Sequence, residues 1–180
     1  MSDTSVAYTG TARFFHWLTV LCVLTMIPAG LLMLRIGSGS LQNFLFDFHR
    51  SMGVVLFVIT AFRLAYRITH KPAPLPADIP ALQKGAAHLV HVILYGFLLI
   101  NPLIGWIGTS AYGAAIKVFG LFTLPPIIAK DKAFATTVLE VHQVMGWIFT
   151  AAVVVHIAAA LFHHFIKHDG ILLRMTRGQT

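Results

Sequence analysis

Charged side chains are scarce in this sequence of 180 residues. Asp, Glu, Lys and Arg together make up 11% of it, whereas a typical soluble domain has about 25%. So few charges cannot coat a water-facing surface of this size, which argues against a soluble enzyme, a disordered chain and a free nucleic-acid-binding domain. Only 6 residues are acidic against 13 basic ones. We expect the basic excess to lie at the edges of a bilayer, against anionic lipid headgroups, and not to bind nucleic acid.

Cysteine is almost missing as well. A single residue, Cys22, excludes an internal disulfide, a thiol relay and a cysteine-based metal cluster. In contrast, the chain has 57% hydrophobic residues and 10 histidines. Because imidazoles are costly inside a membrane and tend to mark function there, the histidines are the first place to look for chemistry.

Four apolar stretches are each long enough to cross a bilayer core of ~30 Å, which takes about 20 helical residues. They are roughly 12–34, 48–68, 86–107 and 136–166. Backbone groups in lipid must bond within their own segment, so we expect helices. The segment 112–126 is expected to be a longer loop with room for a short interfacial helix. The predicted fold class is all-α, a membrane four-helix bundle that forms a single domain over residues 1–180.

The distribution of Lys and Arg predicts the orientation. An N-terminus in the cytoplasm puts eight cations on the inner side and five on the outer side, which favours a multi-pass protein with both termini cytoplasmic. The inner set is Arg13, Arg63, Arg67, Lys71, Lys84, Lys167, Arg174 and Arg177, and the outer set is Arg35, Arg50, Lys117, Lys130 and Lys132.

Four histidines fall at two depths in such a bundle. His142 and His156 are 14 residues apart in the last stretch, which is close to four helical turns and about 21 Å along one face. With alternating helix directions, His49 has the depth of His142 and His16 that of His156. Two pairs from different helices are what two haems between the helices need. Iron held by two histidines is six-coordinate, which suits electron transfer better than oxygen binding.

A repeated motif supports this interpretation. Residues 49–53 and 142–146 both read H-x-x-M-G, so Gly53 and Gly146 each lie one turn after a histidine on the same face. A glycine there leaves room for a flat macrocycle, although helix packing is the alternative explanation. Arg13 and Arg50, each close to one of the histidines, are candidate partners for haem propionates or for lipid headgroups.

His88 and His91 leave an alternative open near the inner start of the third stretch. Either could replace His16 as a ligand, line a quinone pocket or reach lipid headgroups. His163 and His164 are expected to be solvated or bound to headgroups. A histidine-based metal-ion transporter is a rival function, but it would need acidic or histidine groups along one path, and the spans hold almost no Asp or Glu. A third candidate function is that of a plain anchor subunit that docks a catalytic partner.

Several segments together resemble bacterial cytochrome b561. They are residues 13–17 (RFFHW), 48–53 (FHRSMG), 87–91 (AHLVH), the pair His142 and His156, and the ending from His163-His164 to 172–175 (LLRM). The resemblance covers almost the whole chain and implies a bacterial inner-membrane protein with two b-type haems. By position, His16 and His156 would hold one haem and His49 and His142 the other.

The resemblance also implies a class of reaction. Some members are similar to superoxide:ubiquinone oxidoreductases, which collect electrons outside and reduce ubiquinone in the membrane. Related cytochrome b subunits serve hydrogenases and other dehydrogenases as the membrane electron acceptor. The expected partners are therefore membrane lipid, a quinone, and either superoxide or a redox partner protein.

Overall fold

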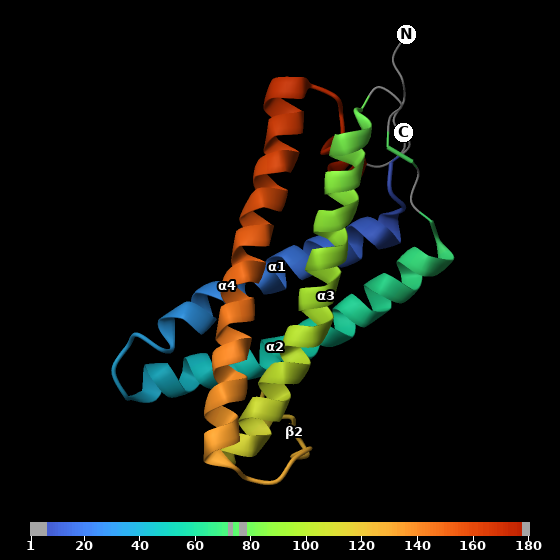
Figure 1. The fold of residues 1–180 in the computed structure, drawn as a ribbon. Coiled ribbons are helices and arrows are strands. Elements are labelled where there is room, and N and C mark those ends of the chain that lie inside the picture. The colour runs from blue at the N-terminus through green and yellow to red at the C-terminus, as the bar shows by residue number, and fades with distance from the viewer. Residues whose placement is uncertain (1–6, 72–73, 76–78, 178–180) are drawn as a thin grey trace.

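The computed structural model describes residues 7–71, 74–75 and 79–177, and it is dominated by four long helices (Figure 1). Each helix is long and apolar enough to cross a membrane, which confirms the predicted four-helix membrane bundle. The helices are α1 (Gly10–Leu32), α2 (Ser40–Thr69), α3 (Ala81–Tyr112) and α4 (Lys132–Phe162). A π-helical turn, η1 (His163–Lys167), continues α4, and a short helix, α5 (Leu173–Thr176), follows.

The helices extend beyond the stretches that hydropathy marks. Helix α2 begins at Ser40 rather than near residue 48, and α3 runs over 81–112 rather than 86–107. Capping groups set two of the actual ends. Thr9 Oγ1 accepts the Ala12 N–H at 3.2 Å before α1, and Asp131 Oδ1 accepts the Phe134 N–H at 3.1 Å before α4. The helices therefore project past the apolar core of a bilayer into its polar edges.

The connection between α3 and α4 contains a β-hairpin. The sequence predicted a longer loop there, with room for a short interfacial helix. Strands β1 (Ile116–Val118) and β2 (Phe122–Leu124) pair antiparallel. Ile116 and Val118 are buried and Lys117 is exposed, as a two-residue strand period requires. The turn places Phe119 at φ 48° and Gly120 at φ 73°, and the Leu121 N–H donates to the Val118 carbonyl at 2.9 Å. Such left-handed turn residues match the twist of a hairpin and not a helix.

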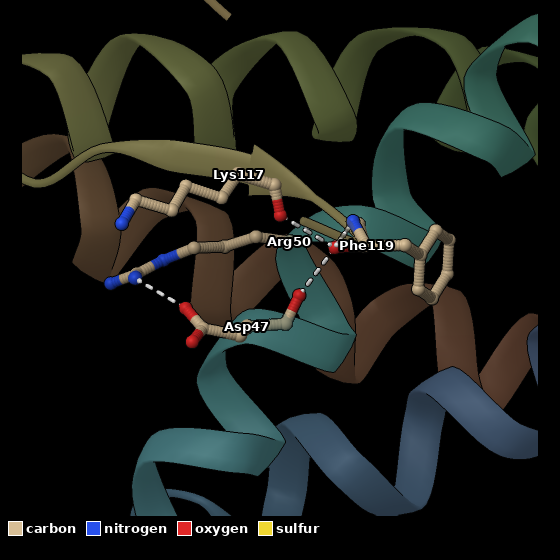
Figure 2. Close-up of polar contacts among 5 residues, drawn as sticks. Asp47, Arg50, Lys117 and Phe119 are labelled. Atoms are coloured by element: carbon tan, nitrogen blue, oxygen red, sulfur yellow. Dashed lines mark hydrogen bonds and ion pairs between the residues drawn. The ribbon is translucent and has the colours of Figure 1, made fainter. Parts of the chain in front are cut away.

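A buried serine fastens this hairpin to α2 (Figure 2). The Ser51 hydroxyl accepts the Phe119 N–H at 3.0 Å. Its own hydrogen is shared between two carbonyls, that of Asp47 at 2.7 Å and that of Lys117 at 3.1 Å. Beside it, the Arg50 guanidinium pairs with the Asp47 carboxylate at 3.6 Å. The hairpin is thus tied to the helix two residues after His49.

Two helical pairs make up the bundle. Helices α1 and α2 pack together, and so do α3 and α4, with the first pair crossing the second at an angle (Figure 1). All four helices contribute to one apolar core, which consists of Cys22, Val23, Leu56, Ile59, Leu98 and Phe149. In α4, Phe149 lies midway between His142 and His156. The core is therefore an apolar layer between two groups of histidines.

Both ends of the described chain lie at one end of the bundle. The Tyr8 N–H donates to the Arg174 carbonyl at 3.0 Å, and the Trp17 indole donates to the Met175 carbonyl at 3.0 Å. An even number of spans requires this arrangement. We call this the terminal end, and the opposite end, where β1 and β2 lie, the hairpin end.

Candidate functional site

At the hairpin end, one imidazole from α2 faces one from α4. The ring centroids of His49 and His142 are 6.0 Å apart and their planes are at 90°. Two imidazoles bound to one metal at about 2.0 Å each have ring centres about 6 Å apart. The spacing of this pair therefore fits a single metal held between the two rings.

A backbone carbonyl fixes the orientation of each of these rings. His49 Nδ1 lies 3.3 Å from the Met26 carbonyl, and His142 Nδ1 lies 3.0 Å from the Asn101 carbonyl. A carbonyl only accepts, so Nδ1 carries the hydrogen in both rings. Each neutral imidazole then keeps its Nε2 lone pair free for a metal.

The two rings open into a large cavity, which we call the hairpin-end cavity. Its volume is ≈ 860 Å³, within the range of about 300–1,000 Å³ that is common for cofactor sites. Gly53 and Gly146 line it, and a Cβ added to either would meet nothing within 4 Å. Open space thus lies where the sequence predicted a flat group against the helices. Arg50 lines the cavity, and so do Arg35 and Trp147, whose ring centre is 5.9 Å from the Arg35 guanidinium.

At the terminal end, three imidazoles gather instead of two. The His156 ring centroid is 6.4 Å from that of His16, with planes at 75°, and 5.5 Å from that of His91, with planes at 65°. Two of the three candidates that the sequence left open for the partner of His156, namely His16 and His91, are therefore close to it. His88 is different, because it is exposed and lines neither cavity.

An arginine that the sequence did not single out contacts this group. Arg63 Nη2 donates to His16 Nδ1 at 3.0 Å, and its guanidinium also lies 5.3 Å from the centre of the Tyr95 ring. Its position on α2 was visible in the sequence only as one cation in a charge count. Arg13, in contrast, lines neither cavity, and its Nε is buried without a hydrogen-bond partner in the described residues.

A second cavity adjoins the three imidazoles, and we call it the terminal-end cavity. It has a volume of ≈ 350 Å³, and His163 lines it together with His16, His91 and His156. His163 Nδ1 forms a close hydrogen bond with the Asp169 carboxylate, which also accepts the Ile171 N–H at 3.2 Å. The sequence predicted a solvated or headgroup-bound His163, and this expectation was wrong because the turn after η1 folds Asp169 back onto the ring.

Comparison with known proteins now identifies the family. A family profile described as prokaryotic cytochrome b561 matches residues 7–178. This chain belongs to the prokaryotic cytochrome b561 family. It is 31% identical to cytochrome b561 homolog 2 of Escherichia coli K12, over 97% of this chain and 93% of that protein. Cytochrome b561 homolog 1 of the same organism is 30% identical, over 93% and 96%.

A third relative carries a more specific name. The probable superoxide oxidase CybB of Yersinia pestis is 27% identical over 89% of this chain and 90% of its own length. Membership in the cytochrome b561 family makes this chain a multi-pass membrane protein of electron transfer. The resemblance noted from the sequence is thereby confirmed.

Cytochromes b561 hold b-type haem, and the residues of the hairpin end fit that group. Two imidazoles with free Nε2 atoms face each other from different helices, and two glycines leave open space beside them. Arg35 and Arg50 line the same cavity and would supply cations for haem propionates. When bound, haem supplies reversible one-electron chemistry. The chain's own part is to hold the ligands in place, to exclude water with its apolar core and to place positive charge at the edge.

Proposed function

We propose that this cytochrome b561 holds two b-type haems and passes electrons from superoxide at the hairpin end to a quinone at the terminal end. The observation that carries the proposal is the pair of histidine groups on either side of one apolar layer. His49 and His142 are the ligands of the hairpin-end haem, and His16 and His156 those of the other. For His16 to offer Nε2 to iron, its Nδ1 must carry the hydrogen and so give up the bond that it accepts from Arg63. Their spacings of 6.0 and 6.4 Å both suit an iron between two rings.

The residues of the terminal-end cavity other than the haem ligands His16 and His156 support a quinone beside the second haem as the acceptor. Reducing a quinone Q to QH₂ takes two electrons and two protons, so the site needs groups that bind carbonyl oxygens and carry protons. His91 and His163 line this cavity, and Asp169 pairs with His163. The remaining lining is mostly apolar, including Phe15, Leu75 and Ile79, which suits a hydrophobic ring.

Positive charge near the hairpin end supports an anionic donor. Arg35 and Arg50 line the cavity there, and Lys117 of β1, and Lys130 and Lys132 at the start of α4, follow nearby, against Asp47, Asp131 and Glu140. Such a rim raises the local concentration of a small anion, and salt weakens the effect. The name of the Yersinia pestis relative suggests superoxide as that anion. The balanced reaction is 2 O₂•⁻ + Q + 2 H⁺ → 2 O₂ + QH₂.

A pyridine haemochrome assay of single-histidine variants tests the haem sites. The wild type should contain close to two haems per chain. His49→Ala and His142→Ala should remove one and the same haem, and His16→Ala and His156→Ala the other. The two haems are told apart by their absorbance spectra and their redox midpoint potentials.

His88→Ala is the matched control, because that ring is exposed and outside both cavities; it should retain both haems. If His16→Ala keeps both haems and His91→Ala loses one, the ligand at the terminal end is His91. A wild type with fewer than two haems would contradict the proposal outright.

Stopped-flow reduction by superoxide tests the reaction. Haem reduction should be fast and slower at high ionic strength, and a ubiquinone analogue should then reoxidise the haem. Slow, salt-independent reduction would instead indicate a cytochrome b subunit that serves a hydrogenase or another dehydrogenase. Lys130→Glu should slow the first reaction and would change nothing in the second case.

A further inference from the structure

Each imidazole at the hairpin end lies directly against a glycine of the neighbouring helix. A Cβ added to Gly30 would be 2.8 Å from His49 Cε1, and one added to Gly105 would be 3.0 Å from His142 Cε1. Real Cβ atoms essentially never come as close as the first of these distances. These contacts differ from those predicted at Gly53 and Gly146, which face open space.

The two contacts follow the same pattern. The carbonyl that accepts from His49 belongs to Met26, four residues before Gly30, and the one that accepts from His142 belongs to Asn101, four residues before Gly105. Residues four apart lie on one face of a helix, one turn from each other. The same Nδ1–Cε1 edge of each imidazole therefore bonds the carbonyl and lies over the missing side chain one turn later, with Nδ1 only 3.0 Å (His49) and 3.2 Å (His142) from the added Cβ.

Each helical pair builds its own half of the site. His49 of α2 lies against α1, and His142 of α4 lies against α3. The 90° angle between the two rings is thus set by two separate helix surfaces, and not by contact of the rings with each other. His16 at the terminal end is held differently, because its Nδ1 accepts from Arg63 instead of donating to a backbone carbonyl.

We propose that Gly30 and Gly105 are positioning residues that set the ring planes of the two hairpin-end histidines, and so select how a haem is bound there. The proposal rests on the haem ligation proposed above. A methyl group at either glycine pushes the imidazole off the helix, stretches its bond to the carbonyl and turns its plane. The tautomer with a free Nε2 then loses the acceptor that favours it.

The test compares Gly30→Ala and Gly105→Ala with Gly96→Ala. Gly96 lies on α3 like Gly105, but a Cβ there would meet nothing within 4 Å, and it lines neither cavity. The readouts are haem per chain, the rate of haem transfer to apomyoglobin, and the low-spin ferric EPR signal, whose largest g value depends on the angle between the axial imidazole planes.

Gly30→Ala and Gly105→Ala should each release the hairpin-end haem at least about tenfold faster, the lower limit for losing a group that orients a metal ligand. Whatever haem remains should have a shifted EPR signal, while the terminal-end haem and Gly96→Ala stay unchanged. Wild-type haem release and an unshifted signal in both variants would overturn the proposal, and so would equal loss of both haems.

His49→Ala separates this proposal from the one on which it rests. If His49→Ala loses the hairpin-end haem and Gly30→Ala leaves it unaltered, only the positioning role is wrong. If His49→Ala itself keeps that haem, the ligand assignment is wrong.

Discussion

Replacing Ser51 by alanine removes the hydroxyl that joins α2 to strand β1 and to the first residue of the hairpin turn. The side chain is only 1% exposed. Its hydroxyl accepts the Phe119 N–H at 3.0 Å, and its single hydrogen is shared between the Asp47 carbonyl at 2.7 Å and the Lys117 carbonyl at 3.1 Å. The substitution leaves that N–H without its partner and changes the volume by a single atom, so packing should be little affected.

The size of the effect follows from the environment of the bond. A buried donor left without a partner costs about 1–3 kcal/mol. The bond to Phe119 is partly buried, so water can replace it in part and the lower half of that range applies. Phe119 also has φ 48°, a conformation that a bulky residue adopts only when its surroundings impose it. We expect local opening to become easier by about 1–2 kcal/mol, a factor of roughly 5–30.

Hydrogen–deuterium exchange of the detergent-solubilised protein measures this opening directly. Peptides that cover 116–124 should exchange roughly 5–30 times faster in Ser51→Ala. Thr136→Val is the control, because its hydroxyl donates at 3.0 Å only to Lys132 within α4. Unchanged exchange in the hairpin, or equal acceleration along all four helices, would refute the reasoning.

Three further outcomes are expected. Gly108→Ala should destabilise the protein by about 1–3 kcal/mol and so lower its thermal midpoint, because its Cβ would be 2.7 Å from Leu139 Cδ2 between α3 and α4. An unchanged midpoint would contradict that packing. Asp169→Asn should slow reoxidation by the ubiquinone analogue and spare reduction by superoxide, since it removes the anionic partner of His163; equal slowing of both steps would count against a role at the quinone. A C-terminal alkaline phosphatase fusion should be inactive and a fluorescent-protein fusion bright, as the cation distribution predicts, and the reverse would invert the orientation.

The parts of the fold that follow from hydropathy were predictable from the sequence. Four long apolar runs have few other solutions in a bilayer, so the spans and their alternation could be derived. Once the helices alternate, the depth of His16, His49, His142 and His156 follows from counting residues at a fixed rise. The same counting could not choose between His16 and His91, because both lie within the first three turns of helices that start at the terminal end.

Other features depend on how each helix is rotated about its axis, which hydropathy does not determine when a helix is apolar all round. Gly30 and Gly105 look like ordinary packing glycines until a histidine of another helix is placed on them. Arg63 is one of several cations until its contact with His16 is known. The hairpin was missed because two strands of 3 residues are too short for a period of two to be recognised.

The apolar layer around Phe149 has an electrical consequence. His142 and His156 are 14 residues apart on α4, which is about 21 Å of a hydrocarbon core of ~30 Å. An electron that passes between the two histidine groups therefore crosses roughly two thirds of the membrane voltage. Moving a full charge across 100 mV corresponds to about 2.3 kcal/mol, so this step responds to voltage by roughly 1.5 kcal/mol per 100 mV. Electron flow from the hairpin end to the terminal end should thus slow or reverse as the membrane becomes more negative on the terminal side.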